Sequence, residues 1–481
     1  MTLEELSSHI RKTFGFVPTR EQEQAIRQFC LFLTDRDNHT VMMMRGCAGT
    51  GKTSLAGAIV RALRTLGQKT VLLAPTGRAA KVFSLRSATT GDACQSKNAE
   101  VQAFTIHRRI YRSMVGVSMA DATYRLNDNL HTDTLFIVDE ASMIANSAPS
   151  ATVFGMGCLL DDLVRYVYSG RNCRLMLIGD AAQLPPVGQE ESPALSPQVM
   201  SGYGMKVYSC DLNEVLRQSA DSGILYNATL IRGYMEGGLP KVRLTGFADV
   251  VVVPGNELIE QLNSSYSQVG VDDTIVVTRS NKRCNIYNQG IRSTILDREE
   301  MLCTGDQLMV VKNNYHWKEG SFIANGDLAV VQRVRNIRQL YGFSFADVWL
   351  RFPDYDDELQ ATVILDCLMS EAPALTYEQQ EKLYNEVMAD YADIPHKADR
   401  LKELKADVYY NALQVKYAYA VTCHKAQGGQ WAHVYLDQGY MTDDMLTPDY
   451  IHWLYTAFTR ATEKLFLVNW PSTQIEVAPS S

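Results

Sequence analysis

Arg45-Gly46-Cys47-Ala48-Gly49-Thr50-Gly51-Lys52-Thr53-Ser54 fits the pattern GxxxxGK(S/T) and follows the apolar run Val41-Met42-Met43-Met44. Glycines let backbone N–H groups close around phosphates, a lysine brings a cation to the β and γ oxygens, and the next hydroxyl can ligate Mg²⁺. A helix predicted from residue 53 to about residue 64 would point its positive end at the same anion. The stretch therefore predicts a site for ATP and Mg²⁺.

Its predicted nucleotide contacts are Gly46, Ala48, Gly49, Thr50, Gly51, Lys52, Thr53 and Ser54, with Thr53 also a metal ligand. The alternative is a glycine turn that happens to precede a helix, which the flanking strand and apolar helix disfavour.

The composition of the 481 residues is that of a globular protein, with 46% hydrophobic and 21% charged residues. A chain of this length is expected to form about two to four domains. No apolar run approaches the roughly 18 residues of a membrane helix, and the N-terminus lacks a basic region followed by an apolar one. The ten cysteines include no CxxC pair, which argues against a zinc site or a disulfide framework. We therefore expect a cytoplasmic protein that does not bind membranes.

The net charge of −8 is not typical of a nucleic-acid-binding protein. It does not exclude one, because a strand can be held in a local groove by backbone amides, hydroxyls and stacking surfaces. Much of the acidity is local, in residues 354–358 and 371–393. We expect this region to be a solvated face that lies away from any polynucleotide.

Short apolar runs separated by helical segments predict a parallel α/β sheet in the first half of the chain. The expected strands are residues 41–45, 70–74, 135–138 and 174–178. Ligands of such sheets bind at the carboxyl ends of the strands. The glycine-rich loop, the segment Pro75-Thr76-Gly77-Arg78 and the pairs Asp139-Glu140 and Gly179-Asp180 all follow predicted strands, so they should lie at one edge.

A second α/β domain is predicted from the strand candidates 274–278, 417–421, 433–436 and 465–468. Between its parts, residues 306–312, 327–334, 347–352 and 360–365 are expected to form a small β barrel. A helix should follow the barrel, with Thr376 and Gln379 as a capping box. Tyr377, Tyr384, Met388 and Tyr391 are expected on one face of this helix. Charged residues then alternate through residues 397–407, which predicts a second, exposed helix.

Three segments carry the residues expected to act on the nucleotide. The apolar run Leu135-Phe136-Ile137-Val138 ends in Asp139, predicted to hold Mg²⁺, and Glu140, predicted to polarise the attacking water. The run Leu177-Ile178-Gly179-Asp180-Ala181-Ala182-Gln183 offers an amide near the γ-phosphate. Arginines stand in Leu216-Arg217-Gln218 and in Thr459-Arg460-Ala461. Taken singly, acids after a strand are often helix caps and arginines often form ordinary surface ion pairs.

Together with Ala74-Pro75-Thr76-Gly77-Arg78-Ala79-Ala80-Lys81 and Thr105-Ile106-His107-Arg108, this ordered set of motifs resembles the superfamily 1B DNA helicases, the RecD-like and Dda-like 5′→3′ family. The resemblance extends from Thr19 to Val468. It implies an α/β fold of two RecA-like P-loop NTPase domains, with a small β-hairpin insertion in the first and an SH3-like β barrel plus helices inserted in the second. The implied boundaries are 1–215 for the first domain, 216–305 and 413–474 for the second, and 306–412 for the inserted region.

The same resemblance implies roles for individual residues. Arg217 and Arg460 would be two arginine fingers that neutralise charge on the transferring phosphoryl group, beside Lys52, Glu140 and Gln183. Gln22 in Thr19-Arg20-Glu21-Gln22 would read the adenine base, although Thr19 and Gln22 also fit a helix capping box. In Thr422-Cys423-His424-Lys425-Ala426-Gln427-Gly428-Gly429, the threonine and histidine would touch the strand, and Gly429 would turn back toward the nucleotide. The implied DNA contacts are Pro75, Thr76, Thr105, His107, Thr278, Asn281, Lys282, Thr422 and His424.

Residues 108–134 would hold a hairpin that wedges the duplex open, with Tyr124 a stacking residue at its tip. A plain surface hairpin is the alternative. The sequence thus predicts a monomeric ATP-dependent DNA helicase that acts on single-stranded and fork DNA, with replication, repair or recombination proteins as expected further partners. Two alternatives remain: a translocase on DNA or RNA that displaces proteins with little unwinding, and an ATP-switched nucleic-acid-binding scaffold. A complete set of catalytic residues argues against the scaffold.

Overall fold

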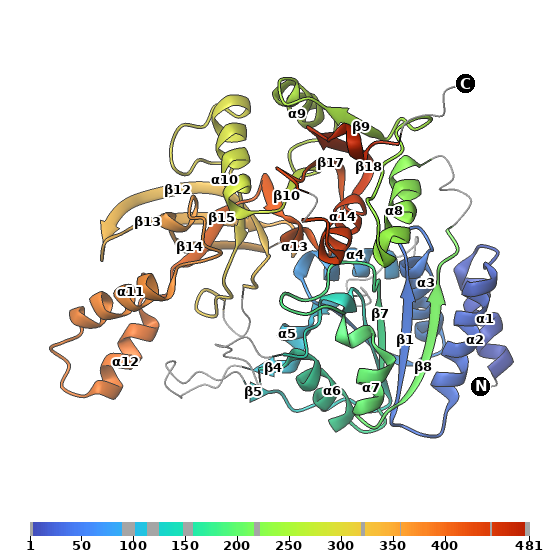
Figure 1. Cartoon of the computed structure of the whole chain (residues 1–481). Helices are drawn as coiled ribbons and strands as arrows, with labels where there is room; N and C mark the ends of the chain where they lie inside the picture. Colours follow the sequence, from blue (N-terminus) through green and yellow to red (C-terminus); the bar gives the residue numbers. More distant parts are fainter. Residues whose placement is uncertain are drawn as a thin grey trace.

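The computed structural model describes residues 3–88, 102–112, 125–147, 157–215, 222–318, 323–355, 357–442 and 445–476. They form two parallel sheets and a closed barrel, with helices packed around the sheets (Figure 1). No helix within these ranges is long and apolar enough to cross a membrane.

The first sheet has six strands in the order β3-β2-β6-β7-β1-β8, and every pairing in it is parallel. Side chains alternate between its faces, so that Met42 and Met44 join one core while Val41 and Met43 join the other. The first core contains α1 to α4, and the second contains α5, α6 and α7. The strands are β1 (Thr40–Gly46), β2 (Lys69–Ala74), β3 (Ala103–Thr105), β6 (Thr134–Val138), β7 (Arg174–Gly179) and β8 (Lys206–Leu212). The helices are α1 (Leu3–Phe14), α2 (Arg20–Thr34), α3 (Lys52–Thr65), α4 (Gly77–Ser87), α5 (Ile106–Ile110), α6 (Leu159–Ser169) and α7 (Pro197–Gly202).

The second sheet has five parallel strands in the order β16-β10-β17-β18-β9. Helices α8 and α14 pack on one face of it, while α9 and α10 pack on the other. The strands are β9 (Val250–Val253), β10 (Thr274–Thr278), β16 (Ala420–Thr422), β17 (Trp431–Asp437) and β18 (Ala461–Val468). The helices are α8 (Gly223–Gly233), α9 (Leu258–Gln268), α10 (Asn281–Gly290), α13 (Cys423–Ala426) and α14 (Pro448–Phe458).

The barrel is closed by β11 (Gln307–Val310), β12 (Leu328–Leu340), β13 (Phe343–Phe352), β14 (Asp357–Ile364) and β15 (Leu413–Tyr417). Its last strand lies beyond the predicted boundary at residue 412. The reason is that Leu413, Val415 and Tyr417 point into the barrel core. The chain enters the second sheet only a few residues later. The predicted strand 417–421 is accordingly two strands, β15 in the barrel and β16 in the sheet.

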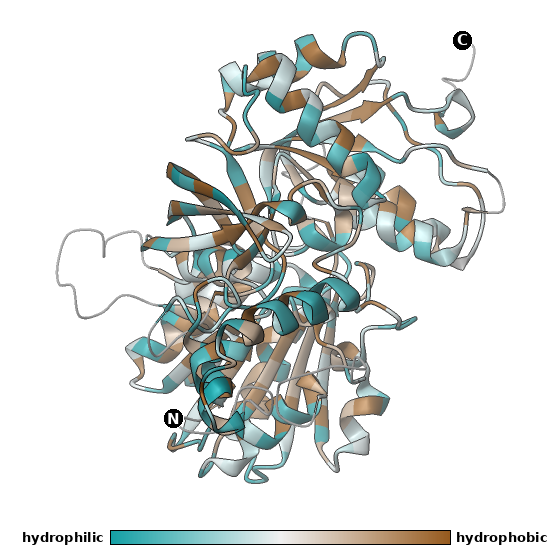
Figure 2. Cartoon of the chain, turned by 90° about the vertical axis from the view of Figure 1, so that its left-hand side faces the viewer, coloured by the Kyte–Doolittle hydropathy of each residue, from teal (hydrophilic) through white to brown (hydrophobic). Residues whose placement is uncertain are grey.

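Two helices extend from the barrel, α11 (Tyr377–Asp390) and α12 (Lys397–Ala406). The predicted capping box of Thr376 and Gln379 is present. Leu383 and Val387 are the buried residues of α11, and Tyr384, Met388 and Tyr391 pack beside them, while Tyr377 is 80% exposed. Seen from the side that carries α11 and α12, these helices are mostly hydrophilic (Figure 2).

A small hairpin leaves the first sheet, formed by β4 (Tyr111–Arg112) and β5 (Arg125–Leu126). Tyr111 pairs with Leu126 in antiparallel register. The predicted hairpin insertion is therefore present at its base, while its tip, including Tyr124, lies outside the described residues.

Candidate nucleotide site and strand-binding residues

The glycine-rich loop joins the buried strand β1 to α3, as its sequence predicts. Gly49 and Gly51 have φ values of +78° and +79°, a backbone region that side chains with a Cβ rarely adopt. The Lys52 ammonium donates to the carbonyl of Cys47 at 2.9 Å and lies 3.9 Å from a carboxylate oxygen of Asp180. The loop therefore has the conformation that presents N–H groups and a cation to one point.

A cavity of about 390 Å³ opens at this loop and is lined from both parallel sheets. Of the predicted catalytic and metal-binding residues, Lys52, Thr53, Asp139, Glu140, Gln183 and Arg460 all line it. The cavity thus unites residues that lie more than 400 positions apart in the chain.

The acidic pair follows β6 at the edge of the cavity. Glu140 has a φ of 54°, uncommon for a residue other than glycine, and its backbone N–H donates to Asp139 Oδ1 at 2.9 Å. Burial and the neighbouring Glu140 raise the pKa of Asp139 to about 7. A nearby divalent cation would oppose both effects by favouring the charged carboxylate.

The donor set fits Mg²⁺ bound together with a nucleotide. Thr53 supplies a hydroxyl and Asp139 a carboxylate to the same cavity. Within the described ranges no cluster of three or more His, Cys, Asp or Glu side chains could hold a metal by itself. Mg²⁺ commonly takes one or two protein oxygens and completes its shell with water and phosphate oxygens.

Gln183 joins the acid of the first sheet to the arginine of the second. With its amide oriented to satisfy both neighbours, it donates to Glu140 Oε2 at 3.3 Å and accepts from Arg460 Nη2 at 3.2 Å. Arg460 is 3% exposed and is held by the carbonyls of Thr456 and Gly429, at 2.9 and 3.1 Å. The predicted contact Gly429 therefore supports the arginine, and its neighbour Gly428 lines the cavity.

Gln22 takes the place that its capping box predicts. Its side-chain oxygen accepts from Thr19 N–H at 3.0 Å, and its amide nitrogen donates to the carbonyl of Thr50 at 2.9 Å. The side chain is 1% exposed. Gln22 thus braces the phosphate loop, and its predicted contact with adenine stays a prediction. Arg217, the other predicted arginine finger, lies outside the described residues.

The predicted strand contacts of the first domain lie at the carboxyl ends of β2 and β3. Thr76 caps α4 and Thr105 caps α5, each through its side-chain oxygen. Pro75 and His107 are partly buried beside them. Burial lowers the pKa of His107 to about 4, so its imidazole is neutral at pH 7.

In the second domain the contacts divide into exposed and buried residues. His424 and Lys282 are exposed, and Thr422 and Asn281 are partly so. Thr278 is completely buried, and its hydroxyl donates to the carbonyl of Ser280 at 3.1 Å. The contact of Thr278 with a strand stays a prediction, since its position in β10 turns the side chain into the core in this structure.

Sequence reasoning assigned no role to Tyr455, which connects the two domains at the phosphate loop. Its hydroxyl donates to Asp180 Oδ2 at 2.6 Å and accepts from the backbone N–H of Ala48 at 2.9 Å. Tyr455 stands five residues before Arg460, so proximity to that motif was the available signal.

Helix α4 makes a further contact between the domains that sequence reasoning missed. Arg78 donates to the carbonyl of Gln430 at 2.7 Å and lies 4.3 Å from the centre of the Trp431 ring. Arg86 donates to the side-chain oxygen of the same Gln430 at 2.9 Å. Arg86 and Gln430 both line the nucleotide cavity.

A cavity at the phosphate loop, lined from two parallel sheets and by Arg460, defines the fold and site of a two-domain P-loop protein. Residues 18–236 match a family described as "AAA domain", and residues 417–468 match "UvrD-like helicase C-terminal domain". The first match covers the segment that carries the phosphate loop and the acidic pair, and the second covers the segment that carries His424 and Arg460. The chain is thus similar in these two segments to a P-loop ATPase domain and to a helicase C-terminal domain.

Three relatives match the sequence. An uncharacterized protein of Acanthamoeba polyphaga mimivirus is 20% identical over 92% of this chain and 98% of its own length. An uncharacterized protein of Methanocaldococcus jannaschii is 23% identical over 94% of this chain but 38% of its own length. The ATP-dependent RecD2 DNA helicase of Deinococcus radiodurans is 26% identical over 47% of this chain and 26% of its own. The chain thus spans well under half the length of the last two.

Solved structures are similar at lower identity. A Pif1 helicase from Bacteroides in complex with ADP-AlF3 and ssDNA is 14% identical, with 96% of this chain and 95% of that chain covered and a TM-score of 0.47. A structure of two coordinating Pif1 helicases at forked dsDNA is 15% identical over the same shares, with a TM-score of 0.48.

Proposed function

We propose that the chain is an ATP-dependent DNA helicase that moves along single-stranded DNA and separates duplex strands. The observation that carries this proposal is the cavity lined by Lys52, Thr53, Asp139 and Glu140 from the first sheet and by Arg460 from the second. A site built from two domains changes when the domains move, so hydrolysis can be coupled to motion.

Each residue has a role that follows from its chemistry. Lys52 would neutralise charge on the β- and γ-phosphates, and Thr53 with Asp139 would hold Mg²⁺, which would supply further positive charge there. Glu140 would orient and deprotonate the attacking water. Arg460, and Arg217 by resemblance, would stabilise charge on the transferring group.

The Gln183 amide is suited to report the state of the γ-phosphate to the second domain. It contacts Glu140 on one side and Arg460 on the other. Arg460 is bonded in turn to Gly429, five residues beyond the exposed His424. This short connection supports a coupling between hydrolysis and the grip on a strand.

The proposed strand path runs across Thr76, Thr105 and His107 of the first domain and Thr422 and His424 of the second. Movement from 5′ to 3′ rests on the resemblance to the RecD-like branch. For the domains we propose 1–215 and 216–305 with 418–474, and an inserted region of 306–417 that includes β15.

Two assays test the proposal. The ATPase rate is measured with and without single-stranded DNA, and unwinding is then measured on duplexes with a 5′ or a 3′ tail. We expect DNA to stimulate hydrolysis and only the 5′-tailed duplex to be opened. Stimulation without unwinding of either duplex would favour a translocase that displaces proteins. Slow hydrolysis that does not respond to DNA or RNA would favour a scaffold.

A further inference from the structure

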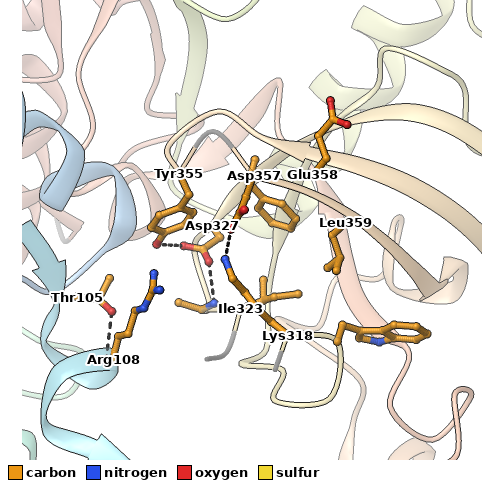
Figure 3. A pocket seen from close by; sticks show the side chains of 12 residues that line it. Thr105, Arg108, Lys318, Ile323, Asp327, Tyr355, Asp357, Glu358 and Leu359 are labelled. Atoms are coloured by element: carbon orange, nitrogen blue, oxygen red, sulfur yellow. Dashed lines mark hydrogen bonds and ion pairs between the residues drawn. The ribbon is translucent and has the colours of Figure 1, made fainter. Parts of the chain in front are cut away.

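A second cavity, of about 220 Å³, lies between the first domain and the barrel. Thr105 and Arg108 line it from the first domain, and barrel residues including Asp327, Phe352 and Tyr355 line it from the other side. Figure 3 shows Arg108 reaching from the first domain toward the Tyr355–Asp327 pair. The cavity takes no part in the proposed hydrolysis.

The cavity adjoins the proposed strand path. Thr105 lines it and is itself a predicted strand contact. Tyr355 packs directly on the first turn of α4, since a Cβ added at Gly77 would lie 1.9 Å from its hydroxyl oxygen. Gly77 follows Thr76, another predicted contact. A group entering the cavity could therefore stay attached to a strand held by Thr76 and Thr105.

A buried carboxylate forms the polar part of the cavity wall. Asp327 is 4% exposed, and its two oxygens accept from Tyr355 Oη at 2.9 Å and from Ala324 N–H at 2.8 Å. Each carboxylate oxygen can accept a second hydrogen bond. Asp327 can thus bind a ligand that carries N–H donors, such as the amino group of a base.

The remaining wall favours a flat, uncharged group. Phe352 and Tyr355 provide aromatic rings, and stacking on such rings is a common way to bind an unpaired base. Lys318 also lines the cavity and is paired with Asp357, so Asp327 and Glu358 are the acids of the lining that would oppose a phosphate. Arg108 is exposed and can meet the backbone phosphate outside.

We propose that this cavity binds one unpaired nucleobase of the DNA strand, stacked on Tyr355 and hydrogen-bonded to Asp327. The inference rests on the proposed function, because it requires that a strand cross Thr76 and Thr105. It adds a base-binding subsite in which the barrel takes part.

An abasic scan tests the subsite. A 5′-tailed duplex fixes the register, one abasic residue is moved through the tail, and the Kd of the full chain is measured by fluorescence anisotropy without nucleotide. We expect one tail position at which loss of the base weakens binding about fivefold or more, the range of a single base stack. The Tyr355→Ala variant should bind the intact strand and the strand that is abasic at that position equally well. Asp327→Asn keeps the shape of the side chain and should reduce the difference, which guards against misfolding of the alanine variant.

Tyr377→Ala is the matched control, because Tyr377 is 80% exposed on α11, away from the cavity. It should keep the wild-type scan. A flat abasic profile in a wild-type chain whose ATPase is stimulated by DNA would overturn the base site alone. An unchanged scan in both cavity variants would do the same. Failure of DNA to bind or to stimulate the wild-type ATPase would instead overturn the proposed function.

Discussion

Replacing Tyr455 with Phe should make nucleotide binding tighter. The Tyr455 hydroxyl accepts a hydrogen bond from the N–H of Ala48, one of the loop residues predicted to contact phosphate. A phosphate that needs this N–H must displace the hydroxyl. Without the hydroxyl, the free protein loses a hydrogen bond that the bound protein does not need.

The size of the effect follows from the bonds that change. A neutral hydrogen bond contributes about 0.5–1.5 kcal/mol net. If only the protein without nucleotide loses the Ala48–Tyr455 bond, the affinity for nucleotide should rise roughly 2- to 12-fold, since about 1.4 kcal/mol is a factor of ten. The bond to Asp180, which is 2% exposed, is charge-assisted and worth about 1.5–3 kcal/mol. Its loss should lower the free energy of unfolding.

The assay is titration of a fluorescent ADP, with urea unfolding measured in parallel. Tyr450→Phe is the matched control, because Tyr450 lies in the same helix and bonds Gln438 at 2.6 Å within the second domain. Both variants should lose stability, and only Tyr455→Phe should bind ADP more tightly. Equal or weaker binding by Tyr455→Phe would show that the hydroxyl does not compete with phosphate.

Further predictions concern hydrolysis, strand coupling and pH. Lys52→Ala and Glu140→Gln should each abolish ATP hydrolysis in a phosphate-release assay, with ATP binding kept in Glu140→Gln; normal turnover by either would remove that residue from the mechanism. His424→Ala should reduce DNA stimulation of the ATPase more than the basal rate, and an unchanged response would make this exposed histidine structural. Burial raises the pKa of Asp327 from 3.8 to about 6. The carboxyl therefore ionises less readily in the folded protein than in the unfolded one, and the free energy of unfolding falls as the pH rises from about 4 to 6. The total fall is up to about 3 kcal/mol. Asp327→Asn has no carboxyl to ionise and should not lose this stability. Urea unfolding at pH 4.5 and pH 7 should therefore show that the wild type loses more stability with rising pH than the variant does. Parallel pH profiles of the two proteins would refute the raised pKa.

Most elements of the fold were predictable because their signals are local. Each predicted strand of the first sheet is present within one residue of its expected start and end. Both capping boxes formed, because the residues involved are three positions apart and their bonds need no other part of the chain. The prediction failed at β15, because the apolar side chains of residues 413–417 could be buried in the barrel or in the second sheet, and only the neighbouring strands decided which.

For the site, too, local motifs were predictable from the sequence and contacts between distant residues were not. The phosphate loop, the acid pair and the arginine motif were recognisable because each needs fixed residue types at fixed spacing, and these are written in the sequence. What the tertiary structure decided is which groups meet across domains. The contact of Tyr455 with Ala48, the joint hold of Arg78 and Arg86 on Gln430, and the cavity between Thr105 and Tyr355 all join residues far apart in the chain. The spacing of residues along the sequence does not predict such contacts, because they depend on how the two sheets and the barrel pack together.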